Sequence, residues 1–464
     1  MKRPTRLLLI ATTTAFLAGA CATAPDGGRQ APPEKPPEEP EMPELEAYES
    51  ISLAVTAGDP QAAIAAYEEA RLQDPDRPET MLLLANLHIS AGQLEEATTV
   101  LDGILDEHPG HPDALYHKAL IAGARGDAEK KESLLQRTVT EDADHAQAHA
   151  ALGEMYLERD EYNEAQSSFE QGLDADEDNF VALIGLGNVF LRTEEPERAE
   201  AVLSRAIENQ PAYPFAYVDR SRARIAEQKL EGAEQDLSRA IELQPEYPWN
   251  YFDRGRVRVE LGELEEARSD FSTAIEMMPE MFMSYIERGR VHDSLGNPRK
   301  AYQDYKKALE LRPEYHPGYA PYGMYAFMQQ DWDTATEMFR KAYENKQRRH
   351  SYALLSALSL KKAGREEEAR SYIERILPEI PRDTLYYDMA RYYVQPHGDS
   401  ALLRKVERSE DRIVKAQLLF HLGALYEIEG EQRLAQTMFV EVQDQGGPAI
   451  IERRLAEWKL QPDE

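Results

Sequence analysis

Residues 248–279 read PWNYFDRGRVRVELGELEEARSDFSTAIEMMP, and this stretch sets the pattern that the rest of the chain follows. Its two halves carry apolar residues at helical spacing, and Gly262 between them favours the left-handed conformation that ends a helix. The stretch therefore predicts two helices joined by a tight turn. Small residues let the helices approach closely, aromatic residues fill the space between them, and a proline ends the second helix. These residues are Tyr251, Gly255, Ala267, Phe271, Ala274 and Pro279.

The same pattern recurs from residue 44 to residue 381 without a slip in register, which gives ten tandem units. The slot of Pro279 is filled in turn by Pro75, Pro109, Ala143, Glu177, Pro211, Pro245, Pro279, Pro313, Gln347 and Pro381. This spacing resembles the tetratricopeptide repeat, whose period is about 34 residues. The resemblance implies an all-α fold, in which tandem helical hairpins bury each other's second face and form a superhelical solenoid.

The third unit departs from the pattern, because Lys131 takes a slot that holds alanine in the other units. An amine cannot be buried unpaired at a close helix contact, so we expect this hairpin to be splayed or locally shifted.

The chain changes character after residue 381. Residues 382–415 are helical in composition but are interrupted at Pro396 and Gly398, and we interpret them as a degenerate helical repeat. Residues 416–449 restore the pattern as a C-terminal unit. Residues 450–464 form a last helix and tail, in which Ile451, Leu455 and Trp458 make one apolar stripe. That stripe is suited to capping the exposed end of the stack.

The N-terminal segment has the features of a secretory signal. Three basic residues precede an apolar run from Leu7 to Ala18, which is too short to span a membrane, and small residues lead to Cys21, the only cysteine. Residues 1–20 resemble a bacterial lipoprotein signal peptide. The resemblance implies that Cys21 is acylated, and Ala22, which is not the aspartate that retains such proteins at the inner membrane, implies sorting to the outer membrane. Residues 21–43, rich in proline and glutamate, are predicted to be a disordered, lipid-anchored linker.

The charge balance limits the partners of the folded part. The chain has a formal net charge of -32, and removal of the signal would make it more negative. Such a surface repels polyanions, so nucleic acid and anionic lipid are poor partners and membrane attachment should depend on the acyl chains.

A comparison among the repeats reveals a joint substitution in three successive units. An arginine on the first helix of each hairpin accompanies an aspartate on the second, in slots where no other unit has either residue type. Partly buried arginine and aspartate are usually paired, so we expect structural ion pairs across each hairpin. The pairs are Arg220 with Asp236, Arg254 with Asp270, and Arg288 with Asp304.

The predicted partner-binding surface lies in the same units. Arg222, Arg256 and Arg290 hold a slot that faces the concave groove in this repeat family, and aromatic and thioether residues share that face. Arginine beside such residues is typical of protein interfaces and carboxylate sites. The alternative is a set of solvated charges that pair along the helix with Asp219, Asp253 and Glu287. The other predicted binding residues are Phe215, Trp249, Phe252, Met283, Met324 and Phe327.

Histidines in the third and fourth units offer a second hypothesis. His145 and His149 are one helical turn apart, and His108, His111 and His117 lie close by in the sequence. This spacing permits shared metal ligation, although His149 holds a slot that packs in other units.

The expected function follows from these features. Motifs for phosphate loops, nucleophile elbows, zinc proteases and cysteine pairs were not found, and we expect neither an enzyme nor a cofactor. We expect a lipid-anchored, periplasm-facing scaffold of the outer membrane that holds a protein or peptide in its groove and acts in envelope assembly or biogenesis. The alternative is a periplasmic accessory protein that binds a small ligand or a metal through the histidine-rich units.

Overall fold

The computed structural model describes residues 42–74, 76–345, 349–446 and 450–461, and every regular element within these ranges is a helix. The predicted signal at residues 1–20, Cys21 and most of the predicted linker lie outside the described residues, as do Pro75 and Gln347. The first described helix begins at Met42, inside the range predicted to be linker. Among the described helices, none combines the length and the apolar character that crossing a bilayer requires.

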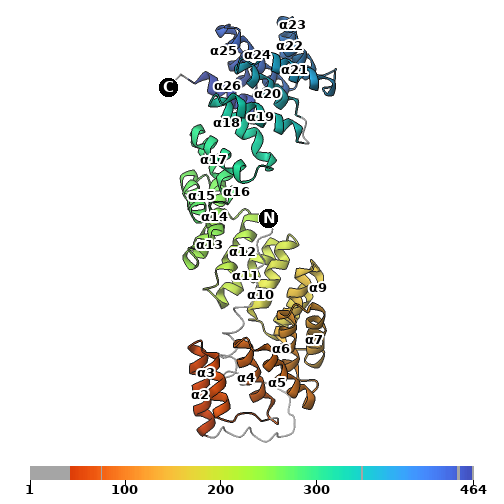
Figure 1. Cartoon of the computed structure of the whole chain (residues 1–464), viewed down its shortest axis with the longest axis vertical. Coiled ribbons are helices and arrows are strands. Elements are labelled where there is room, and N and C mark those ends of the chain that lie inside the picture. Colours follow the sequence, from red (N-terminus) through yellow and green to blue (C-terminus); the bar gives the residue numbers. More distant parts are fainter. Residues whose placement is uncertain (1–41, 75, 346–348, 447–449, 462–464) are drawn as a thin grey trace. The chain divides into compact units, whose positions relative to one another are not determined.

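The chain divides into two compact units, Met1–Ala212 and Tyr213–Glu464, and each is a tandem stack of helical hairpins (Figure 1). The helices of the first unit are α2 (Met42–Thr56), α3 (Pro60–Glu69), α4 (Pro78–Ser90), α5 (Leu94–Glu107), α6 (Pro112–Ala124), α7 (Ala128–Glu141), α8 (Ala146–Glu158), α9 (Tyr162–Ala175), α10 (Phe180–Arg192) and α11 (Pro196–Asn209).

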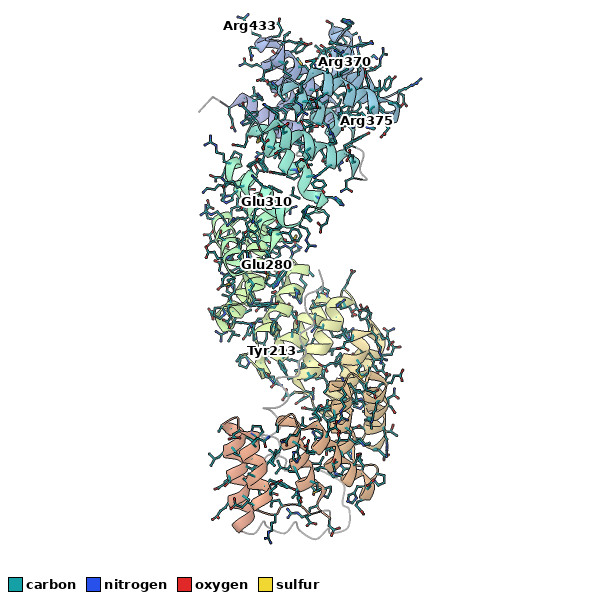
Figure 2. The ribbon with its side chains drawn as sticks, in the orientation of Figure 1. Tyr213, Glu280, Glu310, Arg370, Arg375 and Arg433 are labelled. Carbon is teal, nitrogen blue, oxygen red and sulfur yellow. The ribbon has the colours of Figure 1, made fainter. Side chains whose placement is uncertain are left out.

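The second unit begins at Tyr213, which is labelled in Figure 2. Its hairpins are α12 (Pro214–Ala226) with α13 (Leu230–Leu243), α14 (Pro248–Leu261) with α15 (Leu264–Met277), α16 (Phe282–Ser294) with α17 (Pro298–Leu311), and α18 (Tyr319–Met328) with α19 (Trp332–Glu344). They are followed by α20 (His350–Lys362), α21 (Glu366–Ile376), α22 (Leu385–Val394), α23 (Asp399–Glu407), α24 (Arg412–Ile428), α25 (Gln432–Asp444) and α26 (Ile451–Leu460). Short 3₁₀ turns, η3 (His316–Gly318) and η4 (Leu377–Glu379), precede α18 and follow α21.

The turn inside each hairpin depends on one residue with positive φ. Gly262 ends α14 at φ 82°, and its N–H donates to the carbonyl oxygen of Val259 at 3.1 Å. Glycine reaches this conformation without steric cost, which explains its recurrence in the slot. Where a hairpin lacks the glycine, another residue adopts the same left-handed backbone conformation. These residues are Asp160, Glu194, Gln228 and Gln330, with φ between 58° and 61°.

Close packing between neighbouring hairpins depends on small residues. A Cβ atom at Gly185 of α10 would lie 2.2 Å from Cζ of Phe169 on α9, and one at Gly153 of α8 would also collide with that ring. Phe169 is fully buried. The ring of one hairpin therefore fits against two positions that cannot carry a side chain.

The expectation that the third unit is splayed is wrong. The hairpin of α6 and α7 packs closely, because the aliphatic stem of Lys131 lies over Gly123, where a Cβ would come within 2.9 Å of Cδ. Lys131 as a whole is half-exposed, and its charge acts on Glu154, whose pKa is raised by burial and held down in part by Lys131. Lysine is accommodated because its stem packs while its charge stays near a carboxylate and water.

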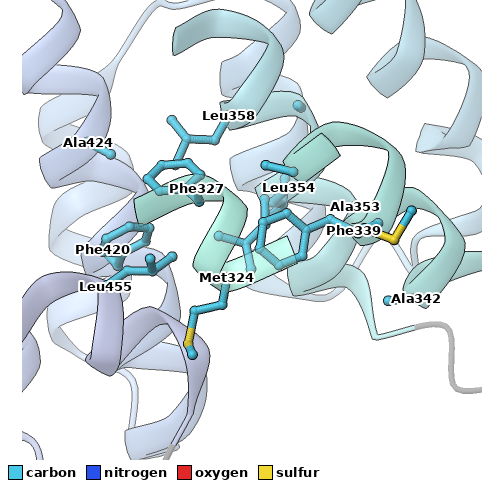
Figure 3. Packing of buried hydrophobic residues seen from close by; sticks show 14 of the residues in the cluster. Met324, Phe327, Phe339, Ala342, Ala353, Leu354, Leu358, Phe420, Ala424 and Leu455 are labelled. Carbon is cyan, nitrogen blue, oxygen red and sulfur yellow. The ribbon is translucent and has the colours of Figure 1, made fainter. Parts of the chain in front are cut away.

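The C-terminal helix α26 packs against α25 and α24, the last hairpin. It also packs against α18, an earlier part of the second unit (Figure 1), which the sequence did not lead us to expect. Leu455 is fully buried and lies near Phe420 of α24, as Figure 3 shows. Arg454 also makes an ion pair with Asp293 of α16. The apolar stripe of α26 therefore covers an internal face of the solenoid.

Candidate binding site

The three arginine–aspartate pairs are present and nearly identical in geometry. Arg254 of α14 donates from Nε and Nη2 to the two carboxylate oxygens of Asp270 on α15, at 3.0 and 2.7 Å. The Asp270 side chain is only 4% exposed and that of Arg254 15% exposed. Such bidentate pairs fix both distance and orientation between two helices. The other two are Arg220 with Asp236, at 3.0 and 2.6 Å, and Arg288 with Asp304, at 2.9 and 2.7 Å.

The pairs belong to a larger network that also connects neighbouring hairpins. Arg254 donates from Nη1 to Ser238 of α13 at 3.1 Å, and Arg258 donates to Asp270 at 2.9 Å and to Glu234 of α13 at 2.7 Å. Sequence reasoning missed Arg258. The available signal was its fixed spacing of four residues from Arg254, which recurs in the preceding unit as Arg224 with Arg220.

The ion-pair partners in this network stabilise the charged form of Arg254. Burial alone would lower the pKa of Arg254, but the hydrogen bonds to Asp270 and the negative charges of Asp270 and Glu234 together outweigh it and raise that pKa. The guanidinium also lies over the ring of Tyr251, 5.7 Å from its centroid. We call the three arginine–aspartate pairs the arginine–aspartate ladder. Its arginines therefore have a structural role, and the side chains open to a partner lie on another face.

That face carries the predicted partner-binding arginines, which are more exposed than the ladder. Arg222, Arg256 and Arg290 recur on α12, α14 and α16, and the side chains of Arg222 and Arg290 are 40% and 56% exposed. Two helical turns before each arginine lies a half-buried apolar side chain on the same helical face: Phe215, Trp249 and Met283 respectively. We call these six residues the arginine strip.

Aromatic rings extend the arginine strip along the hairpin junctions. Phe215 makes edge-to-face contacts with Tyr213 and Tyr247, at centroid distances of 5.6 and 6.0 Å. All three rings are half-buried, so they present apolar surface without being part of a core.

Two of the strip arginines also have the intrahelical partners that the alternative interpretation expected. Arg222 pairs with Asp219, and Arg290 pairs with Glu287 at 3.0 Å. A guanidinium has five N–H donors, so one intrahelical carboxylate leaves donors available to a second acceptor.

Three residues predicted to line the groove do not do so. Phe252, Met324 and Phe327 are buried, and Phe327 is fully buried against Trp332 and Phe420. Figure 3 shows Phe327 beside Phe420. A partner cannot reach these side chains. The physical reason for Met324 and Phe327 is the return of the C-terminal helices onto α18, whereas Phe252 turns towards Phe271 inside its own hairpin.

The histidines of the third and fourth units serve separate local contacts. His145 accepts from the N–H of Ala148 at the start of α8 and lies 3.4 Å from Asp113, whereas His149 contacts the carbonyl oxygen of Ala143. Burial lowers the pKa of His117, which contacts the carbonyl oxygen of Asp113. In the described part of the chain, no three histidine, cysteine or carboxylate side chains are grouped so that they could hold a metal ion.

Comparisons with known proteins agree with the repeat architecture. A tetratricopeptide repeat model matches residues 54–122 and 156–225, and a second one matches residues 252–316. No curated protein matches the sequence.

Three solved structures are among those to which the chain is similar. MamA is 24% identical, covering 35% of this chain and 95% of its own, with a TM-score of 0.34. YrrB, described as a tetratricopeptide repeat protein with an unusual peptide-binding site, is 20% identical over 40% and 95%, with a TM-score of 0.37. PilW, described as a type IV pilus biogenesis factor, is 19% identical over 45% and 96%, with a TM-score of 0.40.

The architecture is thus a solenoid of tandem helical hairpins, the class of repeat scaffold that offers an extended surface rather than an enclosed active site. Within that class, the chain is a tetratricopeptide repeat protein.

Proposed function

We propose that the chain is a membrane-anchored scaffold that binds an acidic segment of a partner protein along the arginine strip. The observation that carries this proposal is the recurrence, on the first helices of three successive hairpins, of an exposed arginine two turns after a half-buried apolar side chain. The rest of the protein is strongly acidic, with a net charge of -32. A local concentration of arginines on such a surface favours a partner of opposite charge.

The binding mode follows from the composition of the strip. The half-buried aromatic rings would anchor apolar side chains of the partner, and the arginines would contact its carboxylates through N–H donors that their intrahelical partners leave available. Repetition along the stack suits an extended or helical segment, which meets one set of contacts per hairpin.

The test removes the charges of the strip without reversing them, because Asp219 and Glu287 would repel an introduced glutamate. In the full chain, Arg222→Gln, Arg256→Gln and Arg290→Gln together should abolish partner capture in native-envelope crosslinking read by mass spectrometry. The matched control is Arg299→Gln, Lys306→Gln and Lys307→Gln, three exposed cations of the neighbouring region. Helical content should be unchanged in both. Equal capture by the two triple variants would refute the strip as the binding site.

The same proposal includes attachment to the outer membrane through Cys21, facing the periplasm, with a role in envelope assembly. It is supported by the basic residues, the short apolar run and the position of the cysteine. Cys21→Ser should release the chain from washed membranes, because acyl chains would supply nearly all of its bilayer affinity. A variant that still sediments with membranes in high salt would contradict anchoring but would leave the binding proposal standing.

A further inference from the structure

A positively charged hollow of about 320 Å³ lies between α15, α16 and α17, away from the arginine strip. These helices span the region of the labels Glu280 and Glu310 in Figure 2. Arg268 contributes from α15, Arg288 and His292 from α16, and Lys300 with Asp304 from α17. Its volume is at the lower end of the range for small-ligand sites.

The hollow is best understood by comparison with the equivalent interface one hairpin earlier. There, Glu234 of α13 occupies the slot that Arg268 has on α15, and Arg258 occupies that of His292. Arg258 joins Glu234 and Asp270 at 2.7 and 2.9 Å, so the earlier interface satisfies its own charges.

Two substitutions convert this balanced interface into a cationic one. Arg268 replaces a glutamate, and Lys300 replaces Glu266, while Arg288 keeps its pair with Asp304. The earlier interface has two arginines with three carboxylates, and the later one has two arginines and a lysine with one carboxylate. Among the described residues, no ion-pair partner lies within range of Arg268 or Lys300.

His292 provides a second, independent observation at this hollow. The residue is only 6% exposed and lines the hollow, yet its Nδ1 has no hydrogen-bond partner. Its other ring nitrogen lies 3.8 Å from Asp304. Buried polar atoms of this kind normally have a partner, so the wall of the hollow contains a polar group that the described side chains leave unsatisfied.

The titration of His292 agrees with an excess of positive charge. Burial lowers its pKa first of all, Asp304 opposes this, and Arg288, Lys300 and Arg268 lower it further. An anion that entered the hollow would offset those three cations and raise the pKa of His292.

We propose that this hollow binds a phosphate group carried as a monoester by a larger molecule. A phosphate monoester carries nearly two negative charges and three acceptor oxygens at neutral pH, which matches the two cations without a counter-charge. Arg268 offers a planar set of donors, Lys300 a mobile one, and the Gln303 amide adds a neutral donor at the edge. A carboxylate has half the charge and would leave one cation unbalanced.

The ester's carrier is either a phosphorylated side chain of a protein or a small phosphorylated molecule, and the probes distinguish them. Calorimetric titrations of the full chain would use inorganic phosphate, glycerol 2-phosphate, a phosphoserine heptapeptide, the unphosphorylated peptide and glutarate. We expect saturable binding of the phosphate-bearing probes alone. A peptide that binds at least about tenfold more tightly than glycerol 2-phosphate would identify a protein carrier.

The decisive variants are Arg268→Glu, which restores the residue of the preceding unit, and Arg299→Glu, which makes the same charge change on an exposed neighbour outside the hollow. Arg268→Glu should weaken phosphate binding by at least about tenfold, and Arg299→Glu by less than about twofold. Arg268→Gln serves the same purpose if the glutamate variant loses helical content. Nuclear magnetic resonance of the imidazole should show the pKa of His292 rising on addition of phosphate.

Three results would overturn the proposal. They are equal weakening by Arg268→Glu and Arg299→Glu, glutarate binding as tight as phosphate binding, and the absence of saturable binding together with an unshifted His292. None of them bears on capture of a partner by the arginine strip, which the strip variants test separately.

Discussion

Replacing Asp270 tests whether the arginine–aspartate ladder holds the hairpins together. The Asp270 carboxylate accepts from two arginines on α14, and its side chain is 4% exposed. In Asp270→Ala, both Arg254 and Arg258 lose this acceptor while their side chains remain only 15% and 18% exposed. Removal of one member of a buried ion pair costs about 3–5 kcal/mol.

The structure places the expected cost at the lower end of that range. Arg254 keeps its hydrogen bond to Ser238, and Arg258 keeps its ion pair with Glu234, so neither guanidinium is left entirely without a partner. We expect Asp270→Ala to destabilise the hairpin by about 3 kcal/mol and Asp270→Asn by less, because the amide oxygen can still accept. Adding Arg254→Leu to Asp270→Ala should recover about 1 kcal/mol, since only Arg258 is then left beside the vacant position.

The assay must report on this hairpin, because long repeat arrays need not unfold in one step. Hydrogen exchange of the α15 amides, read by mass spectrometry, gives the local opening free energy in Asp270→Ala, Arg254→Leu and the double variant. The double-mutant cycle should give a coupling energy of about 2 kcal/mol between the two residues. Additive losses in the cycle would refute the reasoning, and so would protection of α15 that is the same in Asp270→Ala as in the parent chain.

Three further predictions concern other parts of the fold. Burial raises the pKa of Glu452 above its ordinary value of 4.5. The stability that Glu452 contributes to docking of α26 is therefore complete below about pH 4.5 and is lost as pH rises through the folded-state pKa. Glu452→Gln should stabilise α26 at pH 7 by about 1–3 kcal/mol and remove this pH dependence, as hydrogen exchange measured across pH would show. Glu194→Gly should raise stability in urea by about 0.5–1 kcal/mol, because glycine relieves the cost of φ 61°. Gly185→Ala should lower it by about 1–3 kcal/mol, because the added methyl group meets the Phe169 ring; unchanged urea midpoints would contradict these last two.

The repeat architecture could be predicted because its determinants are local and periodic. Gly262, Ala267 and Phe271 act within one hairpin, and each hairpin contacts its neighbours in sequence, so a spacing read from the chain specifies most of the packing. The arginine–aspartate pairs could be found for the same reason. Substitutions that occur together in three units point to contact within each unit.

The C-terminal part could not be predicted in this way, because its decisive contacts join distant segments. Phe327 of α18 packs against Phe420 of α24, and Arg454 of α26 reaches Asp293 of α16. No period relates these residues, so Phe327 looked like a groove residue, and the contacts of α26 with α16 and α18 could not be foreseen. The wrong prediction of a splayed third hairpin had another cause. The space that Gly123 leaves for the Lys131 side chain is visible only when the two helices are placed side by side.

The position of the ladder also explains why both proposed sites lie in the same hairpins. Beyond α17, the slots of Arg288 and Asp304 are taken by Tyr322 and Met338, which are buried, and an extensive apolar cluster follows. From α12 to α17, by contrast, the contacts between hairpins include ion pairs whose members can be exchanged for others of opposite sign, as Glu234 and Arg268 show. Such an exchange changes the charge of a surface hollow without altering apolar packing. This part of the solenoid is therefore the one in which new polar binding sites can arise at the smallest cost in stability.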